Sequence, residues 1–372
     1  MKTLTLLLAL AACAAVVRAQ DAIKVGEYAS LTGKEAGWGQ TSHHGVVLAI
    51  EEINAAGGVL GRPLQLAYED NQSKPGESAT AAKKLISRDK VVALIGEVAS
   101  GRTLEVAPIA QAAHIPMVAP AATNPKVTQA GNYVFRVCFI DDFQGAVMAK
   151  FARDDLHAKK VAILSSVSNA YSVGLAKIFR DTFVAGGGHI VTEKNYSEGD
   201  KDFRAQLTAV KASDVDAVFV PGYYTESALL VRQARELGLA MPFFGGDGWE
   251  DEQLLKIGGD ALNGCYYSTH FSAEDTSPAV VSFIAKYKAR WNGETPGAYS
   301  ALGYDAILVL ADALKRAGTT DGPKLRDALA ATKDFVGVTG KTTINENRDA
   351  SKPATIIALR NGRAIFYKSV LP

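Results

Sequence analysis

Two short loops rich in small and hydroxyl-bearing residues carry the clearest chemical signal in this sequence. The first covers residues 96–103 and contains Ser100, and the second covers residues 120–125 and contains Thr123. Each loop directly follows an apolar run that predicts a buried strand. Hydroxyls beside the free backbone N–H groups of a helix start suit a carboxylate. The loops therefore predict a binding site, and they offer neither a nucleophile nor a base.

The stretch between the loops predicts how they are placed. Residues 102–114 have the pattern of a helix, so the unit reads strand, loop, helix, strand, loop. In a parallel sheet both loops then lie at the same carboxyl edge, where open α/β folds bind small ligands. Ser100 and Thr123 should face each other at that edge.

The rest of the chain repeats this alternation of strand and helix, which is typical of parallel α/β sheets. Strands are expected at 23–26, 64–68, 91–95, 115–119, 161–164, around Ile190, 217–220 and 242–244, and helices at 45–55, 78–88, 173–185, 203–212 and 226–237. The tail differs, with helices expected at 278–291, 298–317 and 323–331 and strands at 342–344 and 355–359. We interpret this as two α/β units in tandem, both completed by a tail that crosses between them.

Length and composition limit the class of protein. The chain has 372 residues, of which 48% are hydrophobic, enough for two domains with their own cores. Forty basic residues balance 39 acidic ones, which argues against a nucleic-acid partner. No nucleophile–base pair can be proposed, so an extracellular hydrolase is disfavoured. We expect a monomer with no enzymatic activity, no cofactor and no bound metal.

The N-terminus has the pattern of an export signal. Met1-Lys2 is followed by an apolar run, Leu4 to Val17, of roughly 14 residues, which is too short to span a bilayer. Residues 1–20 are expected to be a signal peptide, and the protein to be periplasmic. An alternative is a lipobox that ends in Cys13, which would leave the protein lipid-anchored there.

Two further cysteines, Cys138 and Cys265, lie in apolar, strand-like surroundings. They could be two buried free thiols. An oxidising compartment also permits a disulfide between them, although sequence alone cannot give their separation.

The residues together resemble a known family over essentially the whole chain after the leader. The markers are Gly57-Gly58, Tyr68-Glu69-Asp70, Pro120-Ala121-Ala122-Thr123, Asp141-Asp142-Phe143-Gln144-Gly145, Gly174-Leu175-Ala176, Arg232-Gln233-Ala234-Arg235 and Gly303-Tyr304-Asp305-Ala306. In this order they are similar to the leucine/isoleucine/valine-binding proteins, the substrate-binding components of branched-chain amino-acid ABC transporters. The resemblance implies the type I periplasmic binding fold, α/β, with two Rossmann-like lobes of parallel sheet flanked by helices and joined by three hinge strands.

The resemblance also implies where the lobes divide. The chain should cross near residues 139–141, 267–269 and 338–341. Lobe 1 would then comprise residues 21–140 plus 268–339, and lobe 2 residues 141–267 plus 340–372. Cys138 and Cys265 fall beside two of these crossings, which raises the hypothesis of a disulfide at the hinge.

An amino-acid zwitterion needs donors at its carboxylate and an anion with acceptors at its ammonium. By resemblance, Ser100 and Thr123 hold the carboxylate, and Ala121 offers its carbonyl to the ammonium. Asp247 matches the ammonium-binding acid, a glutamate in the best-known members, and Tyr223 faces the same group. The shorter acid withdraws the carboxylate by one methylene, so the position or size of the ligand could differ.

Each polar assignment has a structural alternative. Ser100 could cap the helix that follows it, and Thr123 could close a turn before Pro125. Asp247 could serve the glycine-rich turn in which it lies. Both roles can coexist at Ser100.

Apolar walls should set specificity. By resemblance, Trp38, Tyr171 and Tyr299 line the side-chain pocket, and Val98 and Ala99 form its floor. These residues could instead be plain core. Trp38 and Tyr299 make larger walls than a leucine needs, which leaves an aromatic or elongated ligand open.

The sequence thus predicts an extracytoplasmic receptor of an ABC importer. It would capture a branched-chain or other neutral amino acid by hinge closure and present the closed form to permease subunits in the membrane. The alternatives are a ligand-binding sensor, or a transport receptor for a different small carboxylate, amide or aromatic acid.

Overall fold

The structure is a computed structural model that describes residues 21–372. The expected signal peptide and Cys13 lie outside the described residues. Within the described part of the chain, no helix combines the length and apolar character that crossing a membrane requires.

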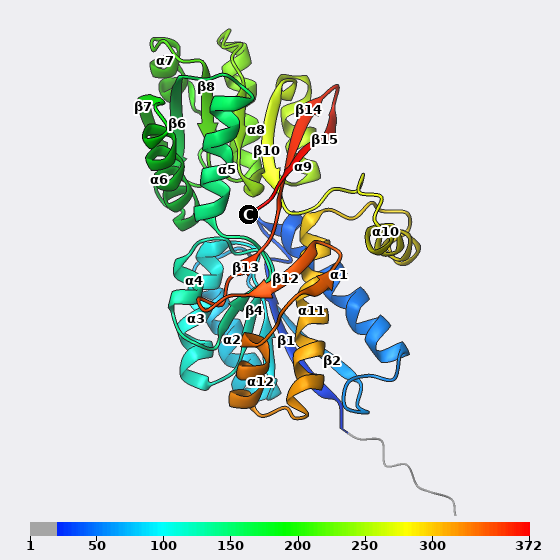
Figure 1. The fold of residues 1–372 in the computed structure, drawn as a ribbon. Coiled ribbons are helices and arrows are strands. Elements are labelled where there is room, and N and C mark those ends of the chain that lie inside the picture. Colours follow the sequence, from blue (N-terminus) through cyan, green and yellow to red (C-terminus); the bar gives the residue numbers. More distant parts are fainter. Residues whose placement is uncertain (1–20) are drawn as a thin grey trace, which may run out of the picture.

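The chain forms two α/β lobes (Figure 1). Lobe 1 is built on a parallel five-stranded sheet of order β2-β1-β3-β4-β5. Its strands are β1 (Ile23–Ala29), β2 (Leu64–Asp70), β3 (Ala93–Ile95), β4 (Met117–Ala119) and β5 (Val134–Arg136), and its first helices are α1 (Ala36–Ala55), α2 (Glu77–Lys84), α3 (Ser100–Ala113) and α4 (Lys126–Gln129). Strands β3 and β4 are buried along their whole length and therefore have continuous apolar sequences.

Lobe 2 is built on a seven-stranded sheet of order β15-β14-β10-β9-β8-β6-β7. Its elements are α5 (Asp141–Asp154), β6 (Lys160–Ser166), α6 (Ala170–Ala185), β7 (His189–Tyr196), α7 (Arg204–Lys211), β8 (Ala217–Val220), α8 (Tyr224–Glu236), β9 (Phe243–Gly245), α9 (Glu252–Gly258), β10 (Cys265–Thr269), β14 (Ala354–Arg360) and β15 (Arg363–Val370). The two-lobe α/β prediction is confirmed. The lobe 2 sheet is mixed, because β14 pairs antiparallel with both β10 and β15.

The described chain passes between the lobes three times, and Figure 1 shows these segments where the two lobes meet. The first passage follows β5 and the second follows β10. The chain then adds α10 (Pro278–Arg290), α11 (Ala298–Ala317) and α12 (Gly322–Ala330) to lobe 1, followed by a small sheet of β11 (Phe335–Gly337), β12 (Gly340–Ile344) and β13 (Ala350–Ser351). The third passage is the short segment Lys352-Pro353 before β14.

The third passage corrects the boundary expected between residues 339 and 340. Asp349 forms an ion pair of 2.7 Å with Arg136 and accepts a hydrogen bond of 2.9 Å from Thr128, and both partners belong to lobe 1. The strands of residues 340–351 therefore lie with lobe 1, and the chain enters lobe 2 only at β14.

Two departures from the sequence-based elements have local causes. Helix α1 begins at Ala36 rather than Gly45, and Gly39 inside this added part permits close packing against the backbone of Ser30. A Cβ at Gly39 would lie 2.0 Å from the carbonyl oxygen of Ser30. Strand β15 escaped the sequence analysis because none of its residues is fully buried, which leaves no alternating apolar signal.

Cys138 and Cys265 are both buried free thiols, so the disulfide hypothesis is wrong. Cys138 lies in the first passage, beside the carbonyl of Ala122. Cys265 begins β10, four residues before the end that leads into the second passage, which is a distance of about 13 Å along a strand. A position near a passage in sequence did not bring the two sulfurs together.

The chain from residue 21 onward should therefore show two titratable thiols when it is denatured without reductant. A thiol-reactive dye measures this directly, and the same sample treated with reductant is the control. An increase of two titratable thiols upon reduction would instead show that Cys138 and Cys265 form a disulfide.

Candidate functional site

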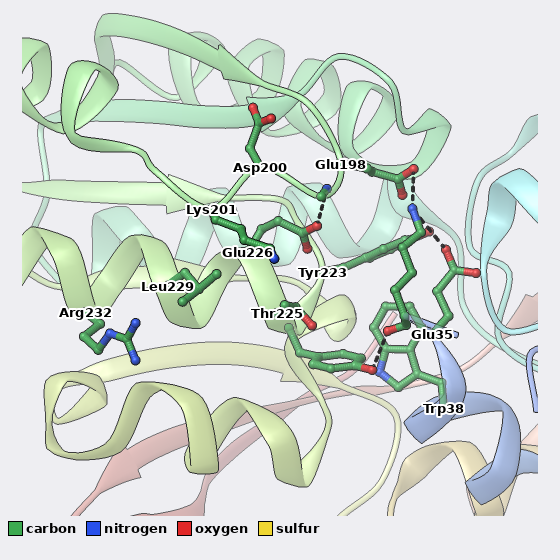
Figure 2. Close-up of a pocket in the computed structure, with 13 residues that line it drawn as sticks. Glu35, Trp38, Glu198, Asp200, Lys201, Tyr223, Thr225, Glu226, Leu229 and Arg232 are labelled. Carbon is green, nitrogen blue, oxygen red and sulfur yellow. Dashed lines mark hydrogen bonds and ion pairs between the residues drawn. The ribbon is translucent and has the colours of Figure 1, made fainter. Parts of the chain in front are cut away.

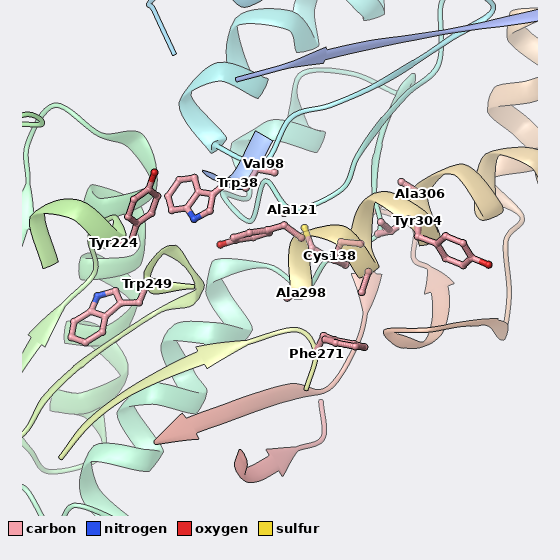
Figure 3. Close-up of a cluster of buried hydrophobic side chains, with 14 of the residues drawn as sticks. Trp38, Val98, Ala121, Cys138, Tyr224, Trp249, Phe271, Ala298, Tyr304 and Ala306 are labelled. Atoms are coloured by element: carbon pink, nitrogen blue, oxygen red, sulfur yellow. The ribbon is translucent and has the colours of Figure 1, made fainter. Parts of the chain in front are cut away.

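Nine of the ten residues expected at the site line one small cavity between the lobes. They are Trp38, Val98, Ser100, Ala121, Thr123, Tyr171, Tyr223, Asp247 and Tyr299, and Gly248 joins them. Ala99 does not line the cavity; it is buried at the residue that precedes α3. Figure 3 shows part of the apolar cluster around the cavity, in which Trp38 of lobe 1 lies beside Tyr224 of lobe 2.

The first loop places Ser100 at the start of α3. The helix begins at Ser100 itself with no side-chain cap, so the capping alternative is wrong. The Ser100 hydroxyl instead accepts a hydrogen bond of 3.2 Å from the backbone N–H of Asn124, which joins the two loops. The first N–H group that bonds back into the helix is that of Thr103, so the earlier ones are available beside the cavity.

A buried arginine, Arg136, holds the second loop in place through hydrogen bonds. The guanidinium of Arg136 donates to the carbonyls of Ala122 and Asn124, the latter at 2.9 Å. The side chain of Asn124 accepts from the N–H of Lys126 and makes the local turn, so Thr123 does not have that role. The geometry leaves Ala121 and Thr123 on the cavity wall.

Asp247 lies on the lobe 2 side, at the start of a short 3₁₀ turn after β9, and only 3% of its surface is exposed. Its carboxylate accepts hydrogen bonds from Gln144 Nε2 at 2.8 Å and His270 Nε2 at 3.0 Å. In the described residues both hydrogen bonds to that carboxylate come from side chains, and none comes from a backbone N–H of the glycine-rich turn. The turn-serving alternative is therefore wrong.

Burial controls the electrostatics around Asp247. Burial lowers the pKa of His270 below its ordinary value, which keeps the imidazole neutral at neutral pH. Burial together with the nearby Asp247 charge holds the pKa of Asp141 well above its usual range. Within residues 21–372, no group of three His, Cys, Asp or Glu side chains is arranged to hold a metal ion.

Aromatic rings close the cavity from both lobes. Trp38 meets Tyr223 edge to face with ring centroids 4.5 Å apart, and Tyr171 stacks on Tyr223 at 5.5 Å. The Tyr299 hydroxyl donates to the backbone carbonyl of Asp247 at 2.6 Å. These contacts hold the polar groups of lobe 2 against the aromatic wall of lobe 1.

The lobes are closed over the cavity. The Trp38 indole N–H donates to the carbonyl of Glu250 at 2.9 Å, and the Tyr224 hydroxyl donates to the carbonyl of Lys34 at 2.7 Å. Figure 2 shows the outer pocket beyond Trp38, of about 390 Å³, where Lys34 also pairs with Glu198 at 2.9 Å. Trp38 and Tyr223 line both spaces, so they separate the cavity from the outer pocket.

Sequence reasoning missed four residues that shape this site: Arg136, Gln144, Glu250 and His270. His270 directly follows a strand of the sheet, and the rule that selected the two lobe 1 loops would have selected it too. Gln144 stands in one of the motifs that carried the resemblance. No local signal marks Arg136 or Glu250, because their partners are distant in sequence.

Glu250 joins the lobes through its side chain as well. Its carboxyl group accepts from the backbone N–H of Ala298, at the start of α11 in lobe 1, and from the hydroxyl of Thr269. Burial raises the pKa of this carboxyl to about 8, from an ordinary value of 4.5. Opening of the lobes would separate Glu250 from Ala298 and expose the carboxyl to water.

Closure should therefore take up a proton at Glu250 between about pH 5 and pH 8, so ligand affinity should fall as pH rises through this range. The variant Glu250→Gln keeps an acceptor for Ala298 and cannot ionise, so its affinity should fall less. Calorimetric titrations from pH 5.5 to 8.5 test this. Parallel pH profiles of the two proteins would contradict a proton at Glu250.

The structure has two hinged α/β lobes that close over a small cavity. Polar groups from both lobes and aromatic rings line this cavity. These features together define a solute-binding protein. Residues 22–364 match the family of periplasmic binding proteins, and the chain belongs to it. Members of this family bind their ligands rather than transform them.

Individual relatives extend over the same length. The chain is 33% identical over 351 residues to the Leu/Ile/Val-binding protein BraC3 of Rhizobium johnstonii, covering 94% of both chains. The leucine-binding protein LivK of Thermotoga maritima matches the structure with a TM-score of 0.90 at 40% identity, over 94% of this chain and 99% of LivK. LivJ of Streptococcus pneumoniae, in complex with isoleucine, gives 0.89 at 34% identity, over 94% and 100% of the two chains.

Proposed function

We propose that this protein is the extracytoplasmic receptor of an ABC importer and that it binds a branched-chain or other small neutral amino acid. One observation supports the proposal: the cavity between the lobes is lined by Ser100 and Thr123 of lobe 1 and by Asp247 of lobe 2. This is the charge pattern of an α-amino-acid zwitterion. The names of the relatives support the same ligand class.

In this proposal the ligand carboxylate lies against Ser100, Thr123 and the first N–H groups of α3, where the helix dipole favours negative charge. The ammonium lies between Asp247 and the carbonyl of Ala121. Lobe 1 alone would bind weakly, and closure adds the contacts of lobe 2. The ligand thus shifts the population toward the closed form.

The cavity lining argues for a small, uncharged side chain. Beyond Ser100, Thr123 and Asp247, the lining consists of Trp38, Val98, Ala121, Gly248 and the rings of Tyr171, Tyr223 and Tyr299. A charged ligand side chain would lose its water without gaining a partner there.

We further propose that the closed form, with both lobes brought together, is what the permease subunits recognise. Export through the signal peptide would place the protein outside the cytoplasm. A role as a sensor for a membrane receptor is the alternative, and an adjacent set of permease and ATPase genes would distinguish the two.

A thermal-shift screen followed by calorimetry tests the ligand. The panel contains the neutral amino acids, the amine-free acid 4-methylpentanoate, leucinamide and benzoate. Tight ligands raise the melting temperature by mass action. We expect the branched-chain amino acids to give the largest shifts; a preference for 4-methylpentanoate or benzoate would contradict the proposal.

A further inference from the structure

A small cluster of buried polar side chains lies behind the cavity, on the side of the hinge. The carboxylate of Asp247 receives one hydrogen bond on each oxygen, from Gln144 to Oδ1 and from His270 to Oδ2. Gln144 lies on the first turn of α5, and His270 directly follows β10. Neither of these two donors lines the cavity.

The His270 ring is held between Asp247 and a second aromatic ring. The imidazole stacks on Phe139 with ring centroids 3.7 Å apart and an interplanar angle of 26°. Phe139 lies in the first passage between the lobes and His270 in the second. Because both rings are buried, the imidazole can neither rotate nor move away without disturbing two hinge segments.

The protonation state of His270 follows from its surroundings. The charged groups that face it are Asp247 and Lys352, and Asp141 lies near Asp247 on the other side. Nδ1 of His270 has no hydrogen-bond partner in the described residues. A second proton on Nδ1 would be buried and unsatisfied, so the neutral ring carries its proton on Nε2 and donates it to Asp247.

We propose that His270 is a positioning residue that fixes the Asp247 carboxylate for the ligand ammonium and ties this carboxylate to the hinge. The inference rests on the proposed function, because it assumes an ammonium at Asp247. A short acid reaches less far than a glutamate, so its orientation matters more. Donors from behind leave the remaining lone pairs of both oxygens directed into the cavity.

The matched variants separate the hydrogen bond from the stacking. His270→Phe keeps a ring against Phe139 but removes the donor, and His270→Gln keeps an N–H donor but removes the ring. His189→Phe makes the same replacement at an exposed position on β7 and serves as the control. Binding of L-leucine and of 4-methylpentanoate to each protein is measured by calorimetry.

We expect His270→Phe to weaken L-leucine binding by about 10- to 100-fold, as expected for loss of a hydrogen bond to a charged group. Binding of 4-methylpentanoate should change by less than about threefold, because this acid has no ammonium for the Asp247 carboxylate to contact. His270→Gln should recover most of the loss, and His189→Phe should bind as the wild type does. Equal weakening of both ligands would show a merely structural role and overturn the inference, as would unchanged leucine binding.

Nitrogen NMR of the histidine rings tests the bond without any ligand. The His270 ring should be the neutral Nε2–H tautomer at pH 7 and should titrate below the ordinary value of about 6.5. A ring protonated on Nδ1 alone would overturn the inference whatever the ligand is. If the wild-type protein binds no amino acid but His270 is the Nε2–H tautomer, the proposed function is contradicted. The hydrogen bond from His270 to Asp247 would then be the one part of the inference that is supported.

Discussion

Replacing Asp247 with asparagine should weaken the binding of L-leucine by about 100-fold or more. The amide keeps the size of the carboxylate but removes the negative charge that faces the ammonium. The cavity is closed and shielded from water, so the loss of a charge-assisted contact is large. His270 and Gln144 both donate to this side chain, and an amide satisfies only one of them well.

Calorimetry measures this loss, and the melting temperature of the ligand-free protein reports on folding. We expect the ligand-free melting temperature to change by only a few degrees, since one buried hydrogen bond is affected. Asp334→Asn is the matched control, because Asp334 is exposed and has a positive φ of 48° that asparagine adopts readily. Unchanged leucine affinity in Asp247→Asn would remove Asp247 from the ammonium site.

Replacing Trp38 with alanine should also weaken binding by about 100-fold or more. Truncating a buried tryptophan to alanine typically destabilises the state in which it is buried by about 3–5 kcal/mol, and here that state is the closed form. Trp38 belongs to α1 of lobe 1, yet its ring packs against Tyr223 and Tyr224 of lobe 2. These contacts depend on closure, so their loss should reduce affinity more than the stability of the open protein. The truncation also joins the cavity to the outer pocket, so bulkier side chains should lose less affinity than leucine.

Trp38→Phe is the matched variant for this prediction. It keeps an aromatic wall, with a smaller ring, and removes the N–H that donates to Glu250. We expect a loss of about tenfold or less from that hydrogen bond. Competition between L-leucine and L-phenylalanine measures selectivity; an unchanged preference in Trp38→Ala would show that Trp38 does not limit ligand size.

The loops that bind could be found from the sequence because they obey a local rule. Ser100 and Thr123 each follow a buried strand, and parallel strands bring their carboxyl ends to one edge. The placement of Asp247, Tyr171 and Trp38 in one cavity was reached through the resemblance, not through local pattern. Their binding roles remain proposals that the variants above test.

The sequence alone could not identify residues whose function depends on a partner far away in the chain. Glu250 meets Ala298 across 48 positions, and Gln144 meets Asp247 across 103. The disulfide hypothesis failed for the same reason, because Cys138 and Cys265 are near hinge passages in sequence but not to each other in space. The position of the third passage between the lobes also depended on the ion pair of Asp349 with Arg136.

The sequence by itself determined most of the strands and helices and the loops that bind, since these follow from hydrophobic periodicity and from small or polar residues over short stretches. Tertiary structure alone decided which loops of the two lobes face each other, how far closure buries Trp38, and which donors hold Asp247. The physical reason is that these contacts join segments far apart in the chain. Their geometry is set by how two sheets pack around a hinge, and no short pattern encodes it.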